Sequence, residues 1–248
     1  MINPYFSRVR LAFLGATIVA GLVSGSTLLG QATQAGDPVA EVRRTVDAAR
    51  KEIAAYTTAG GVAGAADHPA IKWDAALWAY RGKYARSEAA AIASMEAVRL
   101  LVRAELWDRA SARIESVDVD DQAWERLPSV VYEASIARKD VPSTIEKLSR
   151  IAAATSSARI KSSALVVVGR AHRRQGDNEA AIRSFEAAST AAPGTTFAEE
   201  ADGLIYEIKF LSVGLPAPQI AGTSRSGRAV TLAGFRGQAV VLVFWGTT

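Results

Sequence analysis

Residues 161–195, KSSALVVVGRAHRRQGDNEAAIRSFEAASTAAPGT, decide the fold of this chain. Apolar residues recur at helical spacing on both sides of Gly176, and Pro193 ends the stretch. Gly176 suits the end of a first helix, and Asp177 suits the cap of a second one. A small residue at Gly169 would let two antiparallel helices approach closely. The stretch therefore predicts a helical hairpin.

This hairpin resembles the tetratricopeptide repeat, a motif of about 34 residues. The match rests on the large apolar, glycine, alanine, aromatic and proline positions of that motif, here Leu165, Gly169, Gly176, Ala181, Phe185, Ala188 and Pro193. One repeat further on, Gly203 and Tyr206 match again, so we expect one more helix to about Phe210 that caps the stack. That helix would begin at a capping box, Thr196–Glu199. The resemblance implies repeats that bind a peptide or another protein on a concave face; a spacer or dimerisation arm is an equal alternative.

Weaker helical patterns lead back from the hairpin towards the N-terminus. Residues 127–154 fit a degenerate hairpin whose second helix starts at a capping box, Ser143–Glu146, and residues 71–117 supply one or two looser hairpins. Further breaks are expected near Arg81-Gly82, Val117–Asp121, Lys139–Pro142 and Ser156-Ser157. We therefore assign residues 70–212 to tetratricopeptide-like helical repeats, so that the chain is mainly α and forms an α-solenoid.

A separate helix is predicted ahead of the repeats. Asp37-Pro38 combines a side-chain cap with proline at the first helical position, and apolar residues then follow at helical spacing to Tyr56. The Gly/Ala-rich stretch 57–69 ends this helix. Residues 37–69 are therefore expected to be a helix and a connector.

Residues 1–36 have the pattern of an export segment. Arg8 and Arg10 precede an uncharged, mostly apolar stretch from Leu11 to Leu29, and small residues at Ala32 and Ala35 offer cleavage sites. An uncleaved membrane anchor is the alternative. In either case the rest of the chain is expected in the periplasm or at the outer face of the inner membrane. Contact with the membrane is expected only through residues 1–36, and only if they are not cleaved off.

The composition changes at Val213, where glycine, proline and strand-like runs replace the helical pattern. Ile220 is expected to begin a short strand, and RAVTL at residues 228–232 a second one after a turn. Ala239–Trp245 is apolar without alternation, which is typical of a strand in the middle of a covered sheet.

Residues 213–248 resemble the opening of the redoxin group of the thioredoxin superfamily, in particular the TlpA-like thiol–disulfide oxidoreductases and their peroxiredoxin relatives. The positions that match in order are Val213-Gly214, Ala217-Pro218, Gly227-Arg228, Val230, Leu232, Phe235–Gly237, Val240–Val243 and Phe244-Trp245. Ile220, Gln238, Gly246 and Thr248 depart from the family pattern. The resemblance implies the first strands of an incomplete α/β thioredoxin-like domain. It also implies that Phe244, Trp245, Gly246, Thr247 and Thr248 lead to an active site whose first cysteine would come next.

The chain contains no cysteine, so it holds no dithiol and no catalytic residue is predicted in it. We expect an exported oxidoreductase of this type, with a helical protein-binding arm, that is represented by a fragment and is inactive as given. Its substrates would be protein thiols and disulfides. Whether the chain acts as an enzyme stays open, because a non-enzymatic envelope scaffold built on the repeats is the alternative. A β-hairpin appendage packed on the helices is the alternative interpretation of the last 36 residues, and the order of the matching positions argues against it.

Composition excludes several other functions. Without cysteine there are no thiolate metal sites, and the two histidines, His68 and His172, lie far apart, so no metal or cofactor is predicted. His172 is expected to be a packing residue, and the basic run Arg170–Arg174 a solvated helix face. No basic patch interleaved with aromatic residues occurs, which argues against a nucleic-acid partner.

Overall fold

The computed structural model describes residues 37–243. The predicted export segment, residues 1–36, and the family positions Phe244–Thr248 lie outside this range. The described elements are α1 (Pro38–Thr58), α2 (Ala70–Lys83), α3 (Glu88–Arg103), α4 (Trp107–Glu115), the 3-10 helix η1 (Gln122–Glu125), α5 (Leu127–Ala137), α6 (Val141–Ala154), α7 (Ala158–Arg174), α8 (Asn178–Ala191), α9 (Thr196–Phe210), β1 (Ala221–Thr223), β2 (Ala229–Thr231) and the 3-10 helix η2 (Leu232–Phe235). The prediction of a mainly α chain is confirmed. Among the helices of residues 37–243, none combines the length and the apolar character that crossing a membrane requires.

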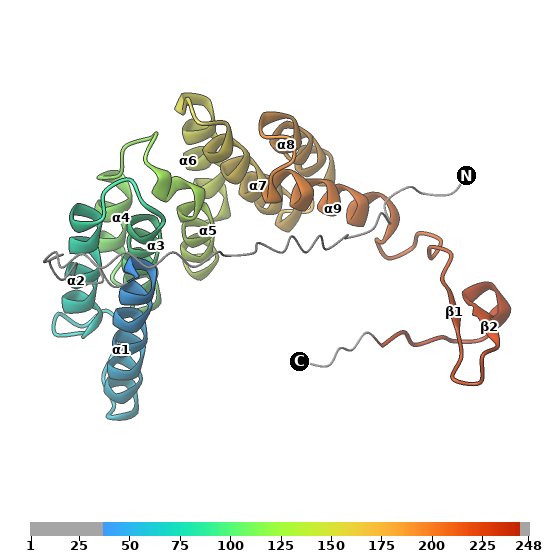
Figure 1. Cartoon of the computed structure of the whole chain (residues 1–248), viewed down its shortest axis with the longest axis horizontal. Helices are drawn as coiled ribbons and strands as arrows, with labels where there is room; N and C mark the ends of the chain where they lie inside the picture. The colour runs from blue at the N-terminus through green and yellow to red at the C-terminus, as the bar shows by residue number, and fades with distance from the viewer. Residues whose placement is uncertain (1–36, 244–248) are drawn as a thin grey trace, which may run out of the picture. The chain divides into compact units, whose positions relative to one another are not determined.

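The helices pack mainly against their neighbours in sequence (Figure 1). The odd-numbered helices α1, α3, α5, α7 and α9 form a continuous series in which each contacts the next. Helices α2, α6 and α8 each pack against the odd-numbered helices on both sides, and α4 packs on α3. The apolar core between them divides into three clusters, one around α1–α3, one around α3–α7 and one around α7–α9. The odd-numbered helices therefore share one surface along the array.

The α7–α8 hairpin has the geometry that its sequence predicts. Gly176 ends α7 with a φ of +84°, and the Asp177 side chain accepts a hydrogen bond from the Ala180 amide at 2.9 Å. Gly169 faces the fully buried ring of Phe185, and a Cβ at Gly169 would lie only 2.4 Å from that ring. The two helices are thus as close as a glycine allows.

Three turns between helices, spaced by about one repeat, contain a residue in the left-handed conformation, and Arg86 and Gly194 adopt it in two other turns. Glu105 lies between α3 and α4, Lys139 between α5 and α6, and Gly176 between α7 and α8, with φ values of 58°, 57° and 84°. Aspartate follows this residue in the last two turns, and its side chain caps the next helix at Asp140 and Asp177. Only one of the three turns carries the glycine that marks such a turn in a sequence. For this reason the break between α3 and α4 is absent from the predicted breaks.

Three boundaries lie one to three residues from the predicted positions. Helix α2 continues through Gly82, where a Cβ would have no other atom within 4 Å. Helix α6 begins earlier than the capping box at Ser143, because Asp140 accepts a hydrogen bond from the Ser143 amide at 3.4 Å. Helix α9 is capped by Thr195 rather than Thr196, since the Thr195 hydroxyl accepts from the Ala198 amide. In both capping corrections a polar side chain just upstream reaches the free amides first.

The C-terminal segment contains a small hairpin and little else that is regular. Strand β1 pairs antiparallel with β2, with Gly222 opposite Val230, and Gly227 in the connecting turn has a φ of +81°. The two short predicted strands are therefore confirmed. The predicted strand Ala239–Trp245 is wrong over its described part, because residues 239–243 are in no strand. An extended segment becomes a strand only when a neighbour bonds to its backbone, and no such neighbour lies within residues 37–243.

A candidate binding groove along the odd-numbered helices

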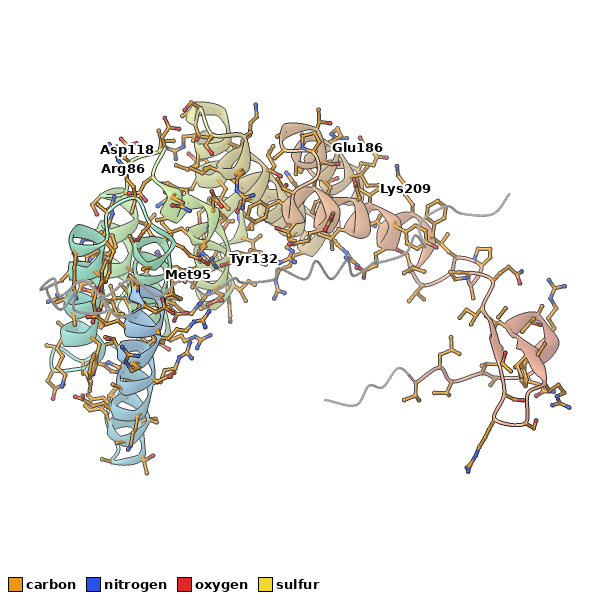
Figure 2. All side chains as sticks on the ribbon, in the orientation of Figure 1. Arg86, Met95, Asp118, Tyr132, Glu186 and Lys209 are labelled. Atoms are coloured by element: carbon orange, nitrogen blue, oxygen red, sulfur yellow. The ribbon has the colours of Figure 1, made fainter. Side chains whose placement is uncertain are left out.

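A groove runs over the shared surface of α1, α3, α5, α7 and α9. It consists of two hollows of about 370 and 230 Å³ that meet at Met95 and Arg126. The first is lined by Arg43, Val46, Asp47, Arg50, Ile92, Met95, Glu96 and Arg126, and the second by Met95, Glu125, Arg126, Ser129, Ser163, Val166, Val167, Arg170, Phe197 and Glu200. The side chains in Figure 2 show Met95 of α3 and Tyr132 of α5 in this part of the array. All five odd-numbered helices thus contribute to a row of two adjacent hollows, which we call the groove.

The floor of the groove is apolar. Ile92 and Met95 lie one turn apart on α3, and each is partly buried against a core cluster. Val166 of α7 is 2% exposed, and Phe197 of α9 packs beside it. Methionine is flexible and polarizable, so Met95 at the junction of the hollows can adapt to side chains of different shape.

The buried charges at the α1–α3 end of the groove are paired. The Glu96 carboxylate is buried on α3 and bonds to Arg99 at 2.8 Å and to Arg50 at 3.4 Å. Arg99 also lies 3.4 Å from Glu133 of α5, so that this network joins three odd-numbered helices. A buried carboxylate needs such partners to remain charged. This end of the groove therefore holds no isolated buried charge.

Ion pairs also join α7 to α9 through the basic run of α7, which is solvent-accessible as predicted. Arg170 bonds to Glu200 at 2.5 Å, and Arg173 makes a two-bond pair with Glu207 at 2.7 and 3.0 Å. The hydrogen bonds from Arg173 hold the pKa of Glu207 below its usual value, and those to Glu207 raise the pKa of Arg173. Two arginines of the predicted solvated face therefore fasten neighbouring helices, while Arg174 is exposed.

A larger cavity of about 720 Å³ lies between the α2–α3 turn and the loop before η1. Arg86 and Asp118, which are labelled in Figure 2, are among the residues that line it. Its carboxylates are engaged: Asp121 bonds to Arg81 at 2.6 Å, and Asp120 accepts two hydrogen bonds from the α6–α7 turn, which lower its pKa. Asp118 accepts from the Asp120 amide at 3.0 Å. These carboxylates hold loops together, and their hydrogen bonds are made within the chain.

A polar cluster fastens α1 to α2. Lys83 donates to Glu41 at 2.8 Å, the Tyr84 hydroxyl donates to the same carboxylate, and Thr45 and Tyr80 share a hydrogen bond of 3.1 Å. Hydrogen bonds from Lys83 and then Tyr84 lower the pKa of Glu41 to about 2, and the same Lys83–Glu41 bond raises the pKa of Lys83. The cluster stabilises the first helix of the array.

Neither histidine lies in a metal-binding group of the described residues. Within residues 37–243, no three His, Asp or Glu side chains gather closely enough to hold a metal ion. His68 is buried, and its Nδ1 accepts a hydrogen bond from the Ala70 amide at 3.1 Å, so that it caps α2. Burial lowers the pKa of His68. His172 is partly buried on α7, consistent with the expected packing role.

The structure places the groove where sequence reasoning expected no binding residue in particular. The family positions Phe244–Thr248 lie outside the described range, so the structure neither gathers nor separates them. Met95 and Arg126, at the centre of the groove, were not among the predicted residues. The spacing of Ile92, Met95 and Glu96 places them on one helix face, but it does not distinguish a groove from a buried core.

Compared with known proteins, the chain matches no protein-family model, no curated protein and no solved structure. The groove and the C-terminal segment are therefore the features on which a function can rest.

Proposed function

We propose that α1–α9 are a tetratricopeptide-like array that binds an extended segment of another protein in the groove between Arg43 and Glu200. The observation that carries this proposal is that the two adjacent hollows of the groove are lined by residues from all five odd-numbered helices. A surface shared by successive repeats suits a ligand that is itself extended. The resemblance of residues 161–195 to the tetratricopeptide repeat supports the same conclusion.

The turn geometry adds independent support for a repeated unit. Glu105, Lys139 and Gly176 occupy the same left-handed position in three successive hairpins, at intervals close to the length of the repeat. The close approach at Gly169 agrees with the small residue that the repeat requires there. Degenerate hairpins and the clear one thus follow the same plan.

The groove offers a ligand apolar contacts that lie between charged side chains, most of them paired. Glu96, Arg170 and Glu200 are already paired with partners on the array, so a charged ligand would have to displace these ion pairs. Met95 and Phe197 instead offer partly exposed apolar surface on either side of the junction. We therefore expect a segment that inserts aliphatic or aromatic side chains into the two hollows.

Photocrosslinking in the expressing cell tests this function. A photoreactive phenylalanine analogue would replace Met95 in the full chain, and a matched variant would carry it at Arg86, in the cavity away from the groove. We expect discrete protein adducts from position 95 that are absent from position 86. Met95→Lys should weaken recovery of the same partner. Equal adducts at both positions, or none at position 95, would remove the groove as the binding site.

We also propose, from the resemblance of residues 213–248, that the array is the arm of an exported thiol–disulfide oxidoreductase of the TlpA type. The hairpin β1–β2 supports this, since it forms where the resemblance expects a turn and two strands. The non-enzymatic envelope scaffold remains the competing proposal. A C-x-x-C within the first codons after Thr248 in the gene would favour the oxidoreductase, and its absence the scaffold. Because the chain has no cysteine, the purified polypeptide should not reduce insulin disulfides.

Export is proposed on the pattern of residues 1–36 alone. The mass of the protein recovered from the envelope of the expressing cell distinguishes cleavage after Ala32 or Ala35 from an anchored chain of full length. Recovery in the cytoplasmic fraction would contradict export altogether.

A further inference from the structure

The charges of the chain are divided unevenly between the helices and the C-terminal segment. All 25 Asp and Glu residues lie between Asp37 and Glu207. The segment from Val213 onward contains no acid and no lysine, and its only charges are Arg225, Arg228 and Arg236. Its net charge is therefore positive, and its charged side chains lie between residues 225 and 236.

The three arginines are exposed and form no ion pair with any residue between 37 and 243. Arg225 and Arg228 lie in and beside the turn that joins β1 to β2, and Arg236 follows η2. By contrast, Arg170 and Arg173 of α7 are both held by glutamates. The cations of the C-terminal segment are thus available to an external anion.

Apolar side chains of the same segment are exposed beside these cations. Val241 is 86% exposed, Val243 75% and Phe235 41%, and Ile220, Val240 and Leu242 are also exposed. The two strands, Phe235, Val240 and Leu242 line a shallow apolar hollow of about 300 Å³. Large exposed apolar patches mark surfaces that are covered in use.

We propose that residues 213–243 bind the surface of an anionic lipid bilayer. The pairing of arginines with exposed aliphatic and aromatic side chains is the composition of interfacial segments, whose binding sums apolar burial and attraction to anionic headgroups. A second copy of the segment is a poorer occupant, because it would bring three further arginines and no acid to the contact. The bilayer satisfies both the charge and the apolar surface at once.

This inference adds a membrane contact to the one expected from residues 1–36, and it does not depend on the groove. It also competes with the redoxin proposal for the same residues. In a redoxin fold, the apolar side chains at Val240–Val243 would lie in the core of that domain and could not reach lipid.

Cosedimentation of the full chain with vesicles tests the proposal. The vesicles would be phosphatidylcholine alone or an equimolar mixture with phosphatidylglycerol. The first variant combines Arg225→Gln, Arg228→Gln and Arg236→Gln. The matched control removes the same charge from exposed, unpaired arginines of the helices, as Arg44→Gln, Arg103→Gln and Arg174→Gln. All chains keep residues 1–36, so their differences report on the substituted positions.

We expect the C-terminal variant to bind the anionic vesicles about 100-fold more weakly, since each arginine near such a surface contributes about fivefold. The control variant should bind as the unaltered chain does. Val241→Ser with Val243→Ser should weaken binding to both kinds of vesicle. Equal loss in the two arginine variants, or no loss in either, would overturn the proposal. Self-association of the lipid-free chain that these same substitutions abolish would instead assign the surface to a second copy.

Discussion

The contact between Gly169 and Phe185 offers a sharp test of the close packing of α7 and α8. In Gly169→Ala the new Cβ would lie 2.4, 2.6 and 2.8 Å from three atoms of the Phe185 ring, whereas ordinary contacts begin near 3.4 Å. The ring is fully buried, so it would have to move by about 1 Å against its own neighbours.

Two opposing effects set the magnitude of this change. Overpacking a core costs about 1–3 kcal/mol, and exchanging glycine for alanine inside a helix returns about 1 kcal/mol. Because a ring is rigid, we expect the upper part of the range and a net loss of about 1–2 kcal/mol. Gly203→Ala is the matched control, since Gly203 holds the same repeat position in α9 and a Cβ there meets nothing within 4 Å. It should stabilise its helix by about 1 kcal/mol.

Hydrogen exchange followed by mass spectrometry suits this comparison, because arrays of repeats open locally rather than all at once. Amides of α7 and α8 should exchange about tenfold faster in Gly169→Ala, and those of α9 more slowly in Gly203→Ala. In a chain that already carries Phe185→Leu, adding Gly169→Ala should reduce protection from exchange less than Gly169→Ala does in the unaltered chain. If Gly169→Ala left protection unchanged or raised it, the two helices would be further apart than described.

Three further predictions concern the ion pairs and turns. Arg113 holds the buried Asp74 carboxylate through two hydrogen bonds of 2.9 Å, and Asp74→Asn removes the counter-charge of this arginine. Thermal unfolding of Asp74→Asn should show a loss of stability of about 2 kcal/mol. An unchanged unfolding midpoint would contradict the pairing. Glu41→Gln should lower the free energy of unfolding at neutral pH. This difference from the unaltered chain should vanish as the pH falls from about 4.5 towards about 2, because the Glu41 carboxylate, whose pKa is lowered in the folded chain, becomes protonated over that range and no longer stabilises the fold. Melting curves across this range check the sign, and a difference that grew on acidification would refute it. Lys139→Gly relieves a left-handed turn and should stabilise the α5–α6 hairpin by about 1 kcal/mol in urea unfolding, with Lys147→Gly, inside α6, as a control that should lose about as much.

Local chemistry made much of the helical part predictable. Asp37, Gly176 and Asp177 act where their side chains, or the lack of one, dictate a helix end. The break at Glu105 was hidden, since tertiary packing there imposes a conformation that the residue itself disfavours. The predicted start of α6 was wrong because Asp140 and Ser143 can both cap a helix, and only the geometry of the structure decides between them.

The groove and the end of the C-terminal segment were less accessible to sequence reasoning. A groove depends on which faces of α1, α3, α5, α7 and α9 stay uncovered, and helical periodicity does not reveal this. Val240–Val243 has the composition of a central strand, yet composition cannot supply the neighbouring strands that would bond to it. The ion pairs of Arg170 and Arg173 likewise depend on where α9 lies.

The packing of helices against near neighbours has a consequence for how the structure forms. No side-chain hydrogen bond within the described range joins residues more than 46 positions apart, the longest being that from Arg50 to Glu96. Short separations of this kind favour rapid folding. A chain that emerges with the N-terminus first, as it does from the ribosome, could close α1 on α2 and α3 while α9 has yet to be made. The helices would then pack in the order in which they emerge. The segment after Val213, with its arginines and exposed apolar side chains, would emerge after the helices that precede it had packed.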